Sequence, residues 1–246
     1  MKKNIGYVVG GSLTLGAGIL FGSMIAASQK SAEVKPDRFS FLARVYDEKI
    51  GSSEKSVGLE DIRKNMIVKV SGRVLETCSG TGRNNQFYDG SKVTELILLD
   101  SSKEMLQESI RKRPKDIVSV KVVQSKDLSL FEDKSFDSVV DTFGICSVEN
   151  PDAFLKDIKR VLKHDGKAFF LEHGRCESGG LVCYFMNKWL DFRAAAHSSY
   201  WGCLWNREIS KLIEDAGFNI QSKEIFHYGT TTEIIATVNE DKYVSA

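Results

Sequence analysis

The sequence predicts an α/β protein with a doubly wound, mostly parallel sheet of seven strands that ends in a C-terminal antiparallel hairpin. Short apolar runs alternate with amphipathic stretches over most of the chain. A glycine-containing turn follows the first run, and polar or acidic residues end several of the others. The predicted fold also includes an N-terminal transmembrane helix, because the chain begins with a long uncharged segment.

The chain divides into three predicted parts. Residues 1–30 form a membrane anchor, residues 31–70 a linker and leading helices, and residues 71–240 the α/β domain. The segment Ile5–Ser28 carries no charged residue and is long enough to cross about 30 Å of hydrocarbon as a helix. A cleaved signal peptide is the alternative, but its apolar core is usually shorter. We therefore expect a single-pass membrane protein.

Small residues recur inside this apolar segment. Gly6 and Gly10 are four positions apart, as are Gly18 and Gly22. This spacing lets two membrane helices approach each other closely. The segment is therefore a candidate contact for a homo-oligomer.

Charge and cysteine content narrow the classes of partner. The formal net charge of +1 lacks the basic excess of a nucleic-acid-binding protein, so no nucleic-acid partner is expected. The five cysteines form no Cys-x-x-Cys pair, and none lies at metal-ligand spacing from a histidine. We expect reduced thiols in or near the core, and we predict no metal site.

Two helices are expected ahead of the α/β domain. The first begins at Arg38 and is broken at Gly51-Ser52-Ser53; the second places Leu59, Ile62 and Met66 on one face. Such helices either pack on the edge of the sheet or cover the ligand site, and the sequence leaves both interpretations open.

Strands and helices then alternate along the chain. After the first apolar run, Val74-Leu75, strands are expected at 93–99, 117–123, 136–140 and 167–171, with a closing hairpin at 218–226 and 230–238. Helices are expected after a cap at Ser101 or Ser102, from Pro151 to a turn at His164-Asp165-Gly166, and at 181–196 and 206–216.

The stretch from Glu76 to Asn84 is the strongest candidate for a ligand loop. Gly80 and Gly82 allow a sharp backbone bend and close approach of a ligand, and a helix can begin after Gly82. No Lys-Ser/Thr follows, which excludes a P-loop, and the Gly-x-Gly-x-x-Gly spacing of dinucleotide enzymes is absent. The loop therefore suits a ligand without a pyrophosphate.

Polar residues at the strand ends can complete this site. Asp100 ends the second strand, where an acidic residue binds ribose hydroxyls; the alternative role is an N-cap for the next helix. Gln124 and Ser125 end the third strand and either contact an adenine edge or belong to a surface loop. Thr142 and Glu172 lie at the ends of the fourth and fifth strands.

Four segments in this order resemble the class I S-adenosylmethionine-dependent methyltransferases, which have a Rossmann-like fold. The segment Glu76–Asn84 resembles their glycine-rich loop, and Asp100–Leu106 resembles their Asp-x-Ser-x-x-Met-Leu segment. Ser135–Val140 is similar to their fourth strand and Ile158–Gly166 to the turn before the fifth. The chain departs from the pattern at the first loop glycine, which is Cys78 here.

This resemblance implies S-adenosyl-L-methionine as the cofactor and a small molecule as the substrate, with residues 71–240 as the methyltransferase domain. The implied cofactor-binding residues are Glu76, Cys78, Gly80, Gly82, Asp100, Ser101, Met105, Gln124, Ser125 and Thr142. Glu172 and His173 are the candidate catalytic residues. Gln124 is neutral where the family usually has an acidic residue.

Two later segments, Leu171–Arg175 and Gly202–Arg207, are similar to the Oms-type mitochondrial inner-membrane methyltransferases and to the thiol methyltransferases of the endoplasmic reticulum. The resemblance implies a membrane-anchored enzyme that methylates a lipophilic or thiol acceptor. It favours the mitochondrial inner membrane, with the endoplasmic reticulum as the alternative. Cys78 and Gln124 favour a second hypothesis, a catalytically silent scaffold or assembly factor in a membrane complex.

Overall fold

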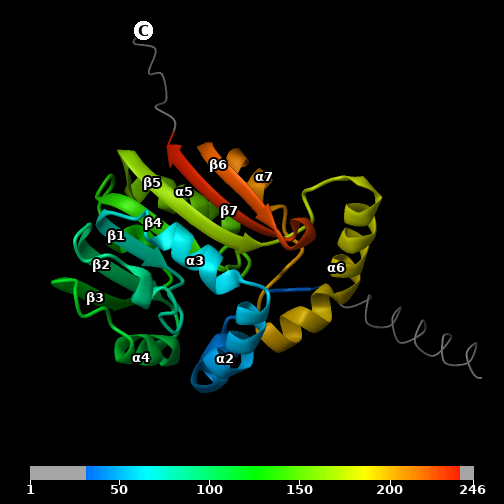
Figure 1. The fold of residues 1–246 in the computed structure, drawn as a ribbon, viewed down its shortest axis with the longest axis horizontal. Coiled ribbons are helices and arrows are strands. Elements are labelled where there is room, and N and C mark those ends of the chain that lie inside the picture. Colours follow the sequence, from blue (N-terminus) through cyan, green and yellow to red (C-terminus); the bar gives the residue numbers. More distant parts are fainter. Residues whose placement is uncertain (1–31, 239–246) are drawn as a thin grey trace, which may run out of the picture.

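The computed structural model describes residues 32–238 and contains a seven-stranded sheet with helices on both faces (Figure 1). The strand order is β3-β2-β1-β4-β5-β7-β6. The first five strands run parallel, whereas β7 is antiparallel to both β5 and β6. This confirms the predicted sheet and its closing hairpin. The strands are β1 (Gly72–Thr77), β2 (Val93–Asp100), β3 (Ser119–Gln124), β4 (Phe136–Thr142), β5 (Leu162–His173), β6 (Phe218–Phe226) and β7 (Thr231–Val238).

Both faces of the sheet are buried, because its central strands are nearly continuous apolar runs. In Figure 1, α3 crosses the front of the sheet, while α5 and α7 lie behind it. Leu155 and Ile213 belong to the core cluster behind the sheet, and Met66 and Ile67 to the cluster in front. The helices are α2 (Asp37–Ser56), α3 (Leu59–Ile67), α4 (Lys103–Arg111), α5 (Pro151–Val161), α6 (Gly180–Trp201) and α7 (Ile209–Asp215).

The order of the strands sets the position of the ligand site. Because β1 lies between β2 and β4, the chain reverses its direction of winding at β1. Crevices at such switch points, beyond the carboxyl ends of the strands, are where ligands bind in open α/β sheets. The loop from Cys78 to Gly82 follows β1 at this point.

The predicted helix break at Gly51-Ser52-Ser53 is wrong, because α2 continues through these residues to Ser56. The chain turns at Gly58, whose φ of 70° suits glycine. Glu54 is buried on α2 and pairs with Arg63 at 3.3 Å and with Arg83 at 2.5 Å. These contacts offset the cost of about 1 kcal/mol that a glycine brings to a helix interior.

No α-helix follows the glycine loop, so the helix expected after Gly82 is also a wrong prediction. The chain forms turns and then a single 3₁₀ turn, Asn85–Phe87. The amide of Asn84 donates to Glu76 at 2.8 Å, and that of Asn85 lies 3.3 Å from the Ser109 carbonyl. These long-range hydrogen bonds hold the segment in a non-helical path, so the glycine loop does not lead directly into a helix N-terminus.

Two other predicted boundaries move in the structure. The turn expected at His164-Asp165-Gly166 lies inside β5, since Leu162 already pairs with Phe136 and the register then shifts. Helix α7 begins at Ile209 instead of residue 206. The guanidinium of Arg207 donates to backbone carbonyls of the β4–α5 loop, which keeps that part of the chain out of the helix.

The prediction of five reduced thiols is wrong for one pair. Cys176 and Cys183 form a disulfide that joins the segment after β5 to the first turns of α6. The Asn187 side chain accepts a hydrogen bond from the Cys176 N–H at 2.7 Å and donates to its carbonyl at 3.2 Å. These bonds hold Cys176 against the helix. Cys78, Cys146 and Cys203 are free.

The predicted membrane anchor, residues 1–30, lies outside the described residues. Within residues 32–238, none of the helices combines the length and the apolar character needed to cross a bilayer.

Candidate functional site

A cavity of about 640 Å³ opens at the carboxyl ends of the central strands, beside the glycine loop. Eight of the ten predicted cofactor residues line it: Glu76, Cys78, Gly80, Asp100, Ser101, Met105, Ser125 and Thr142. Gly82 and Gln124 do not line it. Gln124 is exposed, with its amide 3.5 Å from the Ser101 carbonyl, and Gly82 packs against Asn85 and Ser109.

The loop bends through three residues with positive φ. Cys78, Gly80 and Gly82 have φ angles of 48°, 55° and 75°. Glycine adopts this region freely, but a residue with a Cβ pays about 1–2 kcal/mol for it. Cys78 therefore occupies a position whose backbone conformation suits the glycine that the family pattern has there. Cys78 lines the cavity and also packs against the core cluster behind the sheet.

Asp100 is tied to the loop by both carboxylate oxygens. Oδ2 accepts a hydrogen bond from the Gly80 N–H, and Oδ1 accepts one from the Ser102 N–H, both at 2.8 Å. Burial raises the pKa of Asp100 above its ordinary value. The helix cap itself is Ser102, whose hydroxyl accepts the Met105 N–H at 3.2 Å. Asp100 is thus a cavity-lining acid rather than the N-cap of α4.

Glu76 is buried at the base of the cavity. Its two oxygens accept hydrogen bonds from the Asn84 amide at 2.8 Å and from the Tyr88 hydroxyl at 2.7 Å. Burial raises the pKa of Glu76 from 4.5 to about 7. The side chain therefore joins β1 to the two ends of the segment that follows the glycine loop.

Sequence reasoning missed the polar network that α2 and α3 bring to the cavity. Arg63 is buried and donates to Asn84 at 2.8 Å, to Thr142 at 3.1 Å and to Glu54 at 3.3 Å. Arg83 pairs with Glu54 and also with Asp47. The only signal in the sequence was a set of charged residues on helices that also carry apolar faces.

The two leading helices have different roles. Phe39, Ser40, Tyr46 and Ile50 of α2 line the cavity, so this helix covers the site. Helix α3 instead packs on the sheet, through residues such as Met66. Both interpretations that the sequence left open are therefore realised: α2 covers the site, and α3 packs on the sheet while adding Arg63 to the cavity lining.

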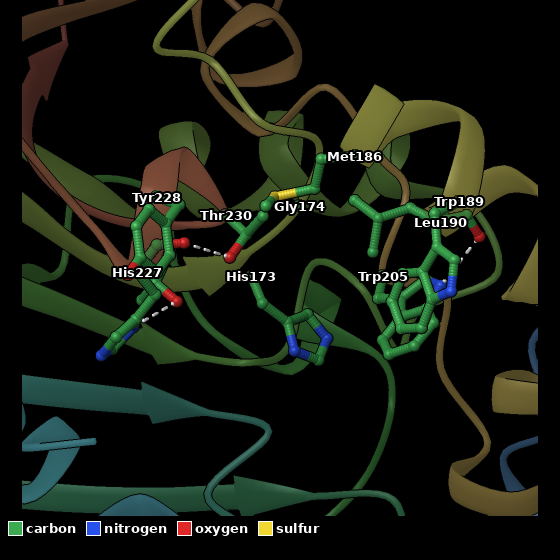
Figure 2. A pocket seen from close by; sticks show the side chains of 10 residues that line it. His173, Gly174, Met186, Trp189, Leu190, Trp205, His227, Tyr228 and Thr230 are labelled. Carbon is green, nitrogen blue, oxygen red and sulfur yellow. Dashed lines mark hydrogen bonds between the residues drawn. The ribbon is translucent and has the colours of Figure 1, made fainter. Parts of the chain in front are cut away.

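A second cavity, of about 520 Å³, lies at the carboxyl end of β5 (Figure 2). The His173 ring stands between His227 and Tyr228 on one side and the indoles of Trp189 and Trp205 on the other. Met186, Leu190, Gly174, Thr230 and Thr231 complete the lining. His173 thus reaches a largely apolar space.

Glu172 faces away from both cavities. Its Oε1 accepts the N–H groups of Gly144 at 2.9 Å and Ile145 at 3.3 Å, and its Oε2 has no hydrogen-bond partner in the described part of the chain. Burial and the neighbouring carboxyl of Asp141 raise its pKa well above the ordinary value. Burial also raises the pKa of Asp141, to about 6. The pair holds the turn after β4.

Comparison with known proteins identifies the family. Residues 75–170 match the family model described as a methyltransferase domain. The human thiol S-methyltransferase TMT1A is 31% identical over 186 residues, which cover 73% of this chain and 74% of the relative. The chain belongs to the class I S-adenosylmethionine-dependent methyltransferases.

Other relatives of this methyltransferase extend the comparison. OMS1, a mitochondrial methyltransferase of Saccharomyces cerevisiae, is 32% identical over 212 residues, which are 79% of this chain and 44% of OMS1. The chain therefore spans less than half the length of that relative. The ubiquinone/menaquinone biosynthesis C-methyltransferase UbiE of Shewanella baltica is 33% identical over 63% of this chain and 65% of UbiE.

Solved structures share the fold of this methyltransferase. The putative methyltransferase complexed with the Trm112 activator of Haloferax volcanii superposes with a TM-score of 0.64 and 16% identity, over 85% of this chain and 99% of that one. A complex of DhpI with SAH superposes with a TM-score of 0.60 and 16% identity, over 84% and 96% of the two chains.

The larger cavity fits S-adenosylmethionine as the cofactor of this methyltransferase. It combines a strand-end acid, Asp100, with a loop whose backbone a ligand can approach at Gly80. Its volume of about 640 Å³ is in the range of pockets for drug-sized ligands. Apolar side chains such as Leu99 and Met105 line it beside these polar groups.

Proposed function

We propose that this methyltransferase methylates the sulfur of a small lipophilic thiol at a membrane surface. The smaller cavity carries the proposal. Trp189, Leu190, Trp205 and Met186 line it, and its lining includes two histidines but no carboxylate or lysine among the described residues. A thiol needs little help from a base, because its pKa is already near the physiological range. The similarity to the human thiol S-methyltransferase TMT1A supports this acceptor class.

The cofactor roles follow from the larger cavity. S-adenosylmethionine supplies an electrophilic methyl group on its sulfonium sulfur. In this proposal Asp100 accepts hydrogen bonds from the ribose hydroxyls, and Gly80 allows close approach of the loop backbone. Arg63, buried in the cavity wall, offers a cation for a carboxylate. Cys78, Ser101, Met105, Ser125 and Thr142 remain predicted contacts, and the placement of Gly82 and Gln124 offers them only indirect roles.

His173 and Glu172 act differently in this proposal. His173 lies in the smaller cavity and can accept the proton of a bound thiol. Glu172 is a positioning residue, because its carboxyl holds the N–H groups of Gly144 and Ile145. The Phe143 ring, which lines the larger cavity, packs against the His173 ring with centroids 5.2 Å apart. The two cavities therefore meet at these two rings, which is where the methyl group and the thiol would approach each other.

Membrane attachment through residues 1–30 belongs to the same proposal. The first half of α6 adds support, since it exposes a group of large apolar side chains: Leu181, Val182, Tyr184, Phe185 and Trp189. Aromatic residues of this kind favour a membrane interface. The similarity to the mitochondrial methyltransferase OMS1 supports a mitochondrial location. Within it we propose the inner membrane, with the endoplasmic reticulum as the alternative. The glycine pairs at Gly6, Gly10, Gly18 and Gly22 are the proposed oligomer contact.

The acceptor class is tested with methyl-labelled cofactor and matched series of alkyl thiols, alcohols and phenols, with and without lipid vesicles. We expect methylated thiols, with rates that rise with alkyl chain length and with vesicles. A Trp189→Ala variant should lose this dependence on chain length. Methylation of phenols in preference to thiols would refute the proposed acceptor. Cofactor binding with no turnover on any acceptor would favour the silent assembly factor.

A further inference from the structure

Three side chains that can ligate metals converge between the two cavities. Cys146 follows β4, His173 ends β5, and Cys203 follows α6. Their ligating atoms all lie within 4.8 Å of one another. Both thiols are buried, at 1% and 6% exposure. Because the three residues come from segments far apart in the sequence, no short sequence motif predicts the cluster.

The separation of two of the ligand atoms suits a tetrahedral metal site. The Sγ atom of Cys203 lies 3.7 Å from Nε2 of His173. Zinc bonds of about 2.3 Å to sulfur and about 2.0–2.1 Å to nitrogen, set at a tetrahedral angle, place the two ligand atoms about 3.6 Å apart. The other pairs of ligand atoms lie within 4.8 Å of one another, so closing on an ion needs a movement of no more than about 1 Å.

Surrounding contacts hold the ligands in place. His197 lies with Nε2 3.3 Å from the Cys203 sulfur, and its ring stacks on Trp205 with centroids 3.9 Å apart. The Leu204 N–H donates to the Cys146 carbonyl at 2.8 Å, which ties the two cysteine-bearing loops together. Preorganisation of this kind is typical of metal sites, whose outer contacts orient the ligands.

We propose that Cys146, His173 and Cys203 bind one zinc ion. Two thiolates and one imidazole are soft and borderline ligands, which favour zinc over magnesium or calcium. Three protein ligands leave the fourth position for water or a substrate, as in catalytic zinc sites. This assignment replaces the sequence-based prediction that the protein has no metal site.

The position of the ion connects it to the proposed acceptor. His173 lines the smaller cavity, and its ring contacts Phe143 of the larger one. A thiol entering the smaller cavity can take the fourth position as a thiolate, with its proton released to solvent. With zinc bound, His173 is a ligand and no longer accepts that proton, so the metal takes over its role in activating the thiol. This role rests on the proposed thiol methylation, whereas the zinc site itself stands on the geometry of the three ligands.

The site is tested by titrating the chelator-treated full chain with cobalt(II), under a phosphine reductant that leaves every cysteine as a thiol. We expect one equivalent to bind and to produce thiolate charge-transfer bands and the visible bands of a tetrahedral ion. Zinc should displace the cobalt and abolish both sets of bands. X-ray absorption of the zinc-loaded protein should show sulfur and nitrogen ligands.

Paired variants assign the ligands. C146S/C203S should lose at least about tenfold in cobalt affinity and its charge-transfer bands. The matched control, C176S/C183S, also removes two thiols and should keep both. Absence of the bands in the wild-type chain, or equal loss in the two variants, would overturn the site. The wild-type titration decides the matter even if C146S/C203S fails to fold. Metal binding without thiol methylation would overturn only the acceptor proposal.

Discussion

Replacing Asp100 by asparagine separates its two roles in the methyltransferase. The carboxylate accepts the Gly80 and Ser102 N–H groups through different oxygens, each at 2.8 Å. An asparagine of the same shape has one acceptor oxygen, so one of these N–H groups faces an amide donor. An unsatisfied buried donor costs about 1–3 kcal/mol, and we expect Asp100→Asn to lower the free energy of unfolding by that amount.

Asp100→Asn should also weaken cofactor binding, and by more than its loss of folding stability alone would cause. Hydrogen bonds from ribose hydroxyls to a charged group are worth about 1.5–3 kcal/mol each, and asparagine removes the charge and one acceptor. A loss of about 2–3 kcal/mol in binding free energy weakens binding by roughly 30- to 140-fold. Calorimetric titration with S-adenosylmethionine and its demethylated product measures this, and urea unfolding measures the stability.

Asp89 provides the matched control for this experiment. Its carboxylate also accepts a backbone N–H, that of Ser91 at 2.9 Å, but it lies outside the cavity. Asp89→Asn should leave cofactor affinity unchanged. If Asp100→Asn binds the cofactor within about threefold of the wild type while remaining folded, Asp100 does not hold the ribose, and the assignment of the cavity loses its main support.

Three further predictions concern the same site. Burial raises the pKa of Glu76 from 4.5 to about 7, so between these pH values the carboxyl is protonated in the folded chain and ionised in the unfolded chain. The free energy of unfolding of the wild type, relative to that of Glu76→Gln, should therefore fall by up to about 3 kcal/mol as the pH rises from about 4.5 to 7. Parallel pH curves of the two proteins in urea unfolding would contradict this. At Cys78, where φ is 48°, the Gly variant should be about 1 kcal/mol more stable than the Ala variant, the reverse of their order in a helix; equal midpoints would show that the backbone there is not strained. Arg63→Met should lower the free energy of unfolding by about 3 kcal/mol, because it removes a buried partner of Glu54. The control Arg111→Met, at an exposed ion pair, should change the free energy of unfolding little. Equal effects of the two substitutions would mean that burial of Arg63 is unimportant.

The sequence by itself determined the elements that local patterns specify. Apolar runs gave the strands, a cap at Ser101 or Ser102 indicated the start of α4, and the position of Asp100 after the glycine loop indicated the site. These signals depend on residues a few positions apart, where strand period, capping and turn chemistry operate. Local propensity failed at Gly51-Ser52-Ser53, because the Glu54 contacts with Arg63 and Arg83 favour a continuous helix.

Only the tertiary structure decided which distant side chains meet. Three features depend on how the strands are ordered and where the loops after them converge. They are the lining of the larger cavity by α2, the disulfide between Cys176 and Cys183, and the approach of Cys146 to Cys203. The spacing of residues along the sequence does not predict these contacts, because two residues at the ends of different strands become neighbours only when the sheet has formed.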